Sequence, residues 1–233
     1  MTSGPYTPYT YTWTPAQPLR SRVHTSPQEL VQISGAFAVL TLDFLLILYF
    51  GGIFYGPGIL AVLPLWEAVA VAATSSLTAF VAHEMAHKVS AQRGGYWAEF
   101  RWAPLWLAFS VFTSYLGFLF AAPGATVVGG MGNPRDWART SLAGPLVNMV
   151  FAVGFYAGSL AAWSSGSLVY FPLLVIAFFN GWFGAFNLIP LGPLDGAKVL
   201  HWSTATWLAA FAVAAAVAGV CFVGLVYFGR PVL

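Results

Sequence analysis

The chain has 233 residues, of which 59% are hydrophobic and 17% aromatic, while only 7% are charged. A soluble domain carries about 25% charged residues, so this chain has too little charge for a water-facing surface, and its natural solvent is a lipid bilayer. The length does not suggest several soluble domains, and the net charge of +2 is too small to indicate a nucleic-acid partner.

The first 28 residues are polar and aromatic, rich in Pro, Tyr and Thr. No apolar stretch occurs before Leu30, so we expect no cleavable signal peptide and predict a flexible tail over residues 1–28. Residues 29–233 then form one transmembrane domain, with a core at about residues 68–200. The single cysteine, Cys221, can form neither an intramolecular disulfide nor a Cys-based zinc knuckle.

Apolar stretches follow in series, and crossing a bilayer takes about 20 mostly apolar residues. In chain order they are 31–55, 68–90, 102–120, 139–163, 169–190 and 206–228. The third is interrupted by Ser and Thr and is followed by Pro123 and Gly124. The pattern predicts an all-α polytopic membrane protein with five to six transmembrane helices.

The positive charges distinguish two topologies. Cytoplasmic loops attract Lys and Arg, so we place the N-terminus in the cytoplasm. If 102–120 crosses fully, Arg135 and Arg139 fall outside. If it enters and returns, they and Lys198 lie inside, and only Arg230 is outside. We favour five full spans with a re-entrant or β-hairpin segment after the second helix, and a sixth full span is the alternative.

The sequence His83-Glu84-Met85-Ala86-His87 near the end of the second span indicates metal chemistry. Residues four apart share one helix face, and imidazole nitrogen suits zinc. Glu84 can act as general base on a metal-bound water, whose pKa the metal lowers to about 7. An ionisable residue within a membrane helix costs about 2.5–3.5 kcal/mol, so three such groups indicate function. The alternative is that both histidines lie at the interface and snorkel.

A zinc hydrolase needs a third protein ligand and one open position for water. His24 lies in the predicted tail, and His201 is better explained as an interfacial residue. Asp195 follows Pro190 and Pro193, which break the fifth apolar helix. Its carboxylate can therefore project towards the second span. The alternative is that Asp195 only caps the next short helix.

Three motifs in this order resemble those of the site-2 protease family of intramembrane metalloproteases. They are His-Glu-Met-Ala-His at 83–87, Ala-Gly-Pro-Leu-Val-Asn at 143–148, and Asn-x-x-Pro-x-x-Pro-x-Asp-Gly at 187–196. The resemblance implies a three-helix catalytic core, cleavage of a substrate's transmembrane helix, and Asp195 as third zinc ligand. It also assigns Asn148 and Asn187 to substrate carbonyl binding or oxyanion support, with interhelical hydrogen bonding as the alternative. The chain departs from the family in the stretch 102–128, in its single span after Asp195 and in lacking a recognisable inserted PDZ domain.

Two further features invite a functional interpretation. Asp43 lies near the middle of the first span, and an intramembrane carboxylate is a functional candidate by default. It either lines a water path or is protonated and bonded to a neighbouring helix, which we favour. Residues 98–102 and 125–129 are plausible strands beside the re-entrant segment. One of them could pair with an unwound substrate by strand addition, or both could be plain loops.

The sequence therefore predicts an intramembrane zinc metalloendopeptidase that cleaves within or near transmembrane segments of membrane-protein substrates. Zn²⁺ is held by His83, His87 and Asp195, and Glu84 activates water, at a depth near the cytoplasmic side. The alternative is a membrane metal transporter or metal sensor that uses the same three ligands as a transit site. Glu84 separates the two, because transit needs no base beside the first ligand. A catalytically silent scaffold is disfavoured by the intact His-Glu-His set.

Overall fold

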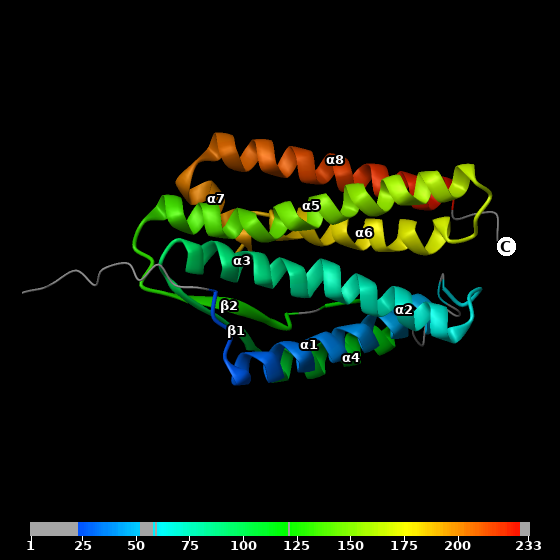
Figure 1. The fold of residues 1–233 in the computed structure, drawn as a ribbon, viewed down its shortest axis with the longest axis horizontal. Helices are drawn as coiled ribbons and strands as arrows, with labels where there is room; N and C mark the ends of the chain where they lie inside the picture. The colour runs from blue at the N-terminus through cyan, green and yellow to red at the C-terminus, as the bar shows by residue number, and fades with distance from the viewer. Residues whose placement is uncertain (1–22, 52–57, 59, 121, 229–233) are drawn as a thin grey trace, which may run out of the picture.

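The computed structural model describes residues 23–51, 58, 60–120 and 122–228. Most of the predicted tail, with Arg20 and Arg22, and the C-terminal Arg230 lie outside these residues. The described chain is helical apart from one two-stranded sheet (Figure 1). Helices suit a bilayer because they pair their backbone N–H and C=O groups internally, where no water is present to do so.

Among the described residues, five helices are long and apolar enough to cross a membrane. The elements in chain order are α1 (Pro27–Leu45), η1 (Leu46–Phe50), α2 (Leu65–Ser76), η2 (Leu77–Val81), α3 (Ala82–Arg93), β1 (Trp97–Trp102), α4 (Pro104–Leu116), β2 (Gly124–Gly129), α5 (Pro134–Ser164), α6 (Tyr170–Asn187), α7 (Asp195–Trp202) and α8 (Thr204–Phe228). The segments η1 and η2 are π-helical, and α2, η2 and α3 form one continuous span. The predicted all-α polytopic membrane fold is confirmed.

The stretch after the second span enters and returns. Helix α4 has 13 residues and is about 20 Å long, whereas the hydrocarbon core of a bilayer is about 30 Å thick. On either side of it, β1 and β2 pair antiparallel, with Trp102 opposite Gly124 and Trp97 opposite Gly129. The segment from β1 to β2 therefore begins and ends at the same place in the fold. This confirms the re-entrant segment and both predicted strands, and no sixth crossing occurs in the described chain.

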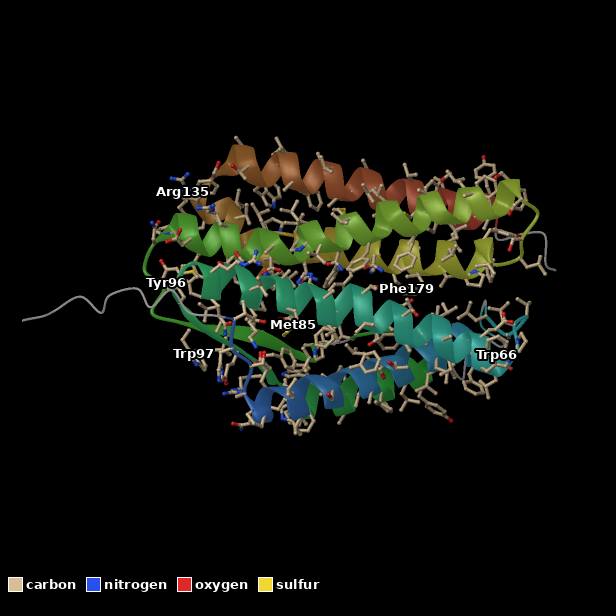
Figure 2. The ribbon with its side chains drawn as sticks, viewed as in Figure 1. Trp66, Met85, Tyr96, Trp97, Arg135 and Phe179 are labelled. Carbon is tan, nitrogen blue, oxygen red and sulfur yellow. The ribbon has the colours of Figure 1, made fainter. Side chains whose placement is uncertain are left out.

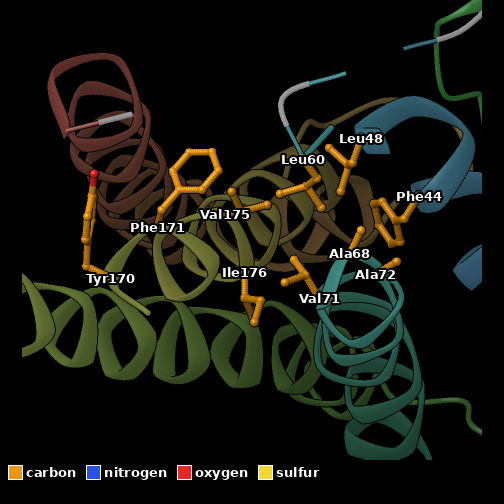
Figure 3. Packing of buried hydrophobic residues seen from close by; sticks show 10 residues of the cluster. All are labelled: Phe44, Leu48, Leu60, Ala68, Val71, Ala72, Tyr170, Phe171, Val175 and Ile176. Carbon is orange, nitrogen blue, oxygen red and sulfur yellow. The ribbon is translucent and has the colours of Figure 1, made fainter. Parts of the chain in front are cut away.

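The helices pack in three groups that Figure 1 separates clearly. Helices α1 and α4 lie side by side, the span α2–η2–α3 occupies the middle, and α5, α6 and α8 pack beyond it. An apolar cluster joins α1, α2 and α6 at the end of the bundle away from the sheet (Figure 3). Its buried members are Phe44, Leu48, Leu60, Ala68, Val71, Ala72, Tyr170, Phe171, Val175 and Ile176.

The outer surface is apolar between two aromatic ends. Helix α8 exposes residues such as Val213 and Phe222, which suits contact with lipid. Figure 2 shows Trp66 at one end of the bundle and Tyr96 and Trp97 at the other. Trp and Tyr gather at membrane interfaces because their rings are amphipathic. The two ends therefore mark the two faces of the bilayer, and we call the end with Tyr96 the sheet end.

The start of α1 is tied to the end of α3. Lys88 Nζ lies 2.5 Å from Glu29 Oε2, and both side chains are almost completely buried, with 1% and 0% exposure. The backbone N–H of His24 donates to Gln92 Oε1 at 3.0 Å. Residues 23–28, which the sequence analysis placed in a flexible tail, are therefore held against the domain. A buried ion pair is costly to break from one side only. The pair therefore fixes the start of α1 against α3, next to the motif at residues 83–87.

Candidate metal centre

The middle span carries the two motif histidines directly after its π-helical segment. Such wider turns redirect side chains within α-helices and occur often at functional sites. The Ala79 carbonyl of η2 accepts a hydrogen bond from Asn148 Nδ2 at 3.0 Å. Thr78 Oγ1, on the same segment, lies 2.8 Å from Asn180 Nδ2. Helices α5 and α6 therefore bind the middle span by hydrogen bonds about one helical turn before His83.

Three side chains with metal-binding atoms converge at the sheet end. The Nε2 atoms of His83 and His87 lie 2.9 Å apart. Asp195 Oδ2 lies 3.3 Å from Nε2 of His83 and 3.0 Å from Nε2 of His87. All three residues are buried, and they form the group of possible metal ligands found in the described chain. The ligand set predicted from sequence is thus brought together.

The second nitrogen of each imidazole has a partner that orients the ring. His87 Nδ1 lies 2.7 Å from the Thr140 carbonyl oxygen, which can only accept, so Nδ1 carries the proton. His83 Nδ1 lies 2.6 Å from Asn148 Oδ1, and the amide faces this way because its Nδ2 donates to Ala79. Both rings therefore direct an unprotonated Nε2 at the same point, as metal-binding histidines do.

This convergence fits a zinc ion. Two nitrogen lone pairs and an ionised carboxylate repel one another at these separations unless a cation lies between them. Atoms at about 2.0–2.1 Å from a tetrahedral zinc lie about 3.3 Å from one another, close to the 2.9, 3.3 and 3.0 Å seen here. Two imidazoles and one carboxylate, with a fourth position open, form a ligand set typical of catalytic zinc sites.

Asp195 reaches the site because the chain turns back sharply after α6. A Cβ atom on Gly196 would lie 2.0 Å from the Leu188 carbonyl oxygen, so only glycine allows this close return. The same carbonyl accepts a hydrogen bond from Trp207 Nε1 at 2.9 Å. The loop between α6 and α7, which contains the predicted helix-breaking prolines, is thereby fixed against α8, with Asp195 as the first residue of α7.

The charge state of Asp195 suits a metal ligand. Burial raises the pKa of its carboxyl. When protons and not a metal occupy the two Nε2 atoms, the attraction of His87 and hydrogen bonds from both histidines outweigh burial and hold the pKa below its usual range. Lys198 Nζ, one turn further on, donates to Asp195 Oδ1 at 3.2 Å. Oδ1 is thus held by Lys198, while the ionised Oδ2 faces His83 and His87.

Helix α5 approaches the histidines through a glycine. A Cβ atom on Gly144 would lie 2.5 Å from His87 Nε2 and 2.7 Å from His83 Nε2. Any side chain here would fill the position that the ligand atoms share. Asn148 follows Gly144 by one helical turn and contacts His83. The spacing of the motif at residues 143–148 therefore has a structural reason. Gly144 leaves room for the two histidine side chains, and Asn148 orients the ring of His83.

Glu84 is bound by strand β2. Its Oε2 accepts the backbone N–H of Thr126 at 2.8 Å. Thr126 Oγ1 lies 2.8 Å from the same Oε2 and 3.0 Å from the Glu84 carbonyl oxygen. These two contacts with one oxygen fix the orientation of the carboxylate. In the described chain Oε1 has no such hydrogen bond.

These groups share one cavity of about 180 Å³. His83, Glu84, His87, Asp195 and Asn187 line it, and residues 122–126 with Val128 form another side. An imidazole pair, the Asp195 carboxylate and the separate Glu84 carboxylate therefore meet beside an extended strand.

The two predicted asparagines occupy different places. Asn187 lines the cavity, and its Nδ2 donates to the Phe183 carbonyl at 2.9 Å. Asn148 lies behind His83 with 0% exposure, and its amide is committed to His83 and Ala79. Support of a substrate carbonyl or an oxyanion stays a prediction for both residues.

Several contributing residues were not predicted from the sequence. They are Thr126, Thr140, Asn180 and Lys198. An amide inside an apolar helix was a usable signal for Asn180, because such groups are costly in a membrane without a partner. Lys198 could have been expected from its position three residues after Asp195 on a helix. Thr140 acts through its backbone carbonyl and Thr126 through a distant strand, so no local pattern reveals them.

Fold and site together define a multi-pass membrane protein with a buried His-His-Asp metal centre, and comparisons with known proteins agree. The chain is 33% identical over 130 residues to the protein named Putative zinc metalloprotease MJ0611 from Methanocaldococcus jannaschii, a match covering 55% of this chain and 68% of that protein. It is 32% identical over 143 residues to Putative zinc metalloprotease Rip3 from Mycobacterium tuberculosis, covering 58% of this chain and 31% of Rip3.

The chain belongs to the site-2 protease family of zinc metalloproteases. Zinc is accordingly the cofactor that its His-His-Asp group fits. The chain spans less than a third of the length of Rip3. No family model and no solved structure matches it.

Proposed function

We propose that this protein is an intramembrane zinc metalloprotease that hydrolyses peptide bonds within or near transmembrane segments of other membrane proteins. The observation that carries the proposal is the shared cavity, in which a zinc-fitting triad lies beside a separately held carboxylate, Glu84. Metal storage or transit would need the triad alone. A carboxylate that does not ligate the metal, but faces the same space, is what hydrolysis of an amide needs.

The roles of the residues follow from their contacts. His83, His87 and Asp195 would hold zinc, which supplies Lewis acidity to the scissile carbonyl and acidifies a water molecule. Glu84, with Oε2 fixed by Thr126, accepts the proton from the attacking water and passes it to the leaving amine. Peptide hydrolysis then consumes one water and yields one carboxylate and one amine, with no further reactant.

We propose that β2 holds the substrate in an extended form. A helical peptide bond is shielded by its neighbours, so it must unwind before attack, and strand addition to a sheet edge achieves this. The outer edge of β1 is already used: Phe100 N–H donates to Glu29 Oε1 at 2.9 Å, and the Ala98 carbonyl accepts from Gln92 Nε2 at 2.9 Å. Residues 124–126 and Val128 of β2 line the cavity, where the Thr126 N–H already donates to Glu84 Oε2. The substrate would pair with the remaining backbone groups of this strand.

We further propose that the sheet end faces the cytoplasm. The Lys and Arg residues of the described chain all belong to segments at this end: Lys88, Arg93, Arg101, Arg135, Arg139 and Lys198. Positive residues near membrane helices mark the cytoplasmic side. The N-terminus and the zinc site then lie on or near the cytoplasmic side of the membrane.

The test is a cleavage assay with purified full-length protein in detergent, a panel of transmembrane peptides, and Glu84→Gln as the variant. We expect cleavage to fall by about 10²–10⁴-fold in Glu84→Gln, with about one zinc still bound per chain, and to stop when a zinc chelator is added. Glu67→Gln, the same chemical change at the far end of the same helical span, is the matched control and should retain activity.

Cleavage that survives chelation, or full activity in Glu84→Gln, would contradict the proposal. In proteoliposomes, metal flux that is unchanged in Glu84→Gln, in the absence of any peptide cleavage by the wild type, would instead support the transporter alternative.

A further inference from the structure

A second groove runs along a different face of α3, between α3 and α5, which lie side by side in Figure 1. Its volume is about 850 Å³, and the proposed proteolysis does not use it. Small side chains at Ala82, Ala86 and Ala143 leave it open, and Leu146 and Phe151 also line it. Leu146 is 56% exposed. This part of the groove is apolar.

The end of the groove nearest the sheet is cationic. Arg93 and Arg139 line it and are exposed. Asp136 lies there too, but it accepts a hydrogen bond from Tyr96 Oη at 2.6 Å. Within the described chain neither arginine side chain has a hydrogen bond or an ion pair. Two free guanidinium groups that line the same groove suit a phosphate, whose oxygens guanidinium groups can bind in pairs.

The length of the groove matches one leaflet. Its lining residues follow α3 from Ala82 to Arg93, a helix of 12 residues, or about 18 Å. Half of the hydrocarbon core of a bilayer is about 15 Å thick. Figure 2 shows Tyr96 at the sheet end and Met85, another lining residue, deeper along α3. The arginines therefore lie at headgroup level and the apolar part at the depth of an acyl chain.

We propose that the groove between α3 and α5 binds one anionic phospholipid from the surrounding leaflet, with its phosphate on Arg93 and Arg139 and an acyl chain along Ala82, Ala86 and Ala143. The protein's own first 22 residues are a poorer occupant, because they contain no Asp or Glu and carry Arg20 and Arg22. Free phosphate would leave the apolar part uncovered.

The lipid would lie against the metal site. Thr140 lines both the groove and the zinc cavity, and its carbonyl oxygen orients His87. Lipid bound here packs against both helices that contribute to that contact. The inference does not rest on the proposed protease activity, since lipid binding is measured without a substrate.

The experiment uses the full chain in detergent and native mass spectrometry with phosphatidylglycerol or phosphatidylcholine of identical acyl chains. We expect one phosphatidylglycerol to be retained per chain with about tenfold preference or more over phosphatidylcholine. R93Q/R139Q should lose that preference. R135Q, which removes an exposed arginine outside the groove, is the matched control and should keep it. Val147→Trp, which fills the apolar part without changing charge, should weaken retention of both lipids.

Equal retention of phosphatidylglycerol by wild type and R93Q/R139Q would overturn the proposal. So would displacement of the lipid by inorganic phosphate alone, which would identify the site as one for the free anion. A change of oligomeric state in Val147→Trp, with lipid retention unaltered, would assign the groove to a second copy of this chain instead.

Discussion

Two buried polar sites within the membrane bundle differ in how completely they are organised. At the metal centre three ligand atoms lie within 3.3 Å of one another, and partners orient both imidazoles from behind. At Asp43, Oδ2 accepts from Ser110 Oγ of α4 at 2.6 Å, while Oδ1 has no hydrogen-bond partner among the described residues.

The difference shows what identifies a site in a membrane protein. Burial of a carboxylate is common to both places, because Asp43 is 0% exposed and Asp195 6%. Only Asp195 meets other ligands. The favoured bond from Asp43 to a neighbouring helix is confirmed, and its protonation stays a prediction. Convergence of ligand atoms, with neighbouring groups that orient them, is therefore a better criterion for a functional site than burial of a carboxylate.

The largest effect is expected from Asp195→Ala. Loss of one of three ligands should reduce bound zinc from about one per chain to near zero and abolish cleavage, because two imidazoles alone leave the site too open to retain zinc. Elemental analysis of the purified protein measures the zinc. Asp136→Ala, a carboxylate change on α5 away from the site, should retain it. Unchanged zinc in Asp195→Ala would remove Asp195 from the ligand set.

A smaller effect on the metal is expected from Asn148→Leu. The substitution keeps the size of the side chain but removes the acceptor for His83 Nδ1, so zinc affinity should fall about 10–100-fold. Competition with a chelator of known affinity measures it. Asn187→Leu removes an amide that does not contact a histidine and should leave the affinity unchanged. Equal zinc affinity in the two variants would show that the hydrogen bond between His83 and Asn148 does not contribute to zinc binding.

Thr126→Val should reduce cleavage about tenfold, with zinc content unchanged. The variant keeps the backbone N–H on Glu84 but removes the hydroxyl, and a hydrogen bond to a charged group contributes about 1.5–3 kcal/mol. The loss should appear in kcat, because Glu84 acts in the chemical step. Thr126→Ser retains the hydroxyl and should restore most of the rate. A loss of zinc in Thr126→Val would mean that β2 supports the ligands as well as the base.

The smallest effect is expected from Asp43→Asn. The amide has the same shape and keeps an oxygen for Ser110, so zinc content and cleavage should stay within about twofold of wild type, with any change confined to the melting temperature Tm. A tenfold loss of cleavage without loss of folded protein would show that Asp43 belongs to the catalytic machinery. The contrast between the two buried sites would then fail.

The sequence by itself determined the features that depend on neighbours along the chain. Apolar runs of sufficient length predict spans, because the bilayer sets one length for every helix. His83 and His87 share a face because the α-helix repeats every 3.6 residues. The two strands and the returning segment between them also followed from local composition and the distribution of Lys and Arg.

Tertiary structure alone decided which distant groups complete the site. The contacts of Glu84 with Thr126, His83 with Asn148 and His87 with Thr140 join residues 42, 65 and 53 positions apart. It also showed that Asn148 lies behind a ligand and not on the cavity wall. The physical reason is that composition and helical period act within a few residues, whereas the orientation of a side chain depends on which helix or strand packs against it.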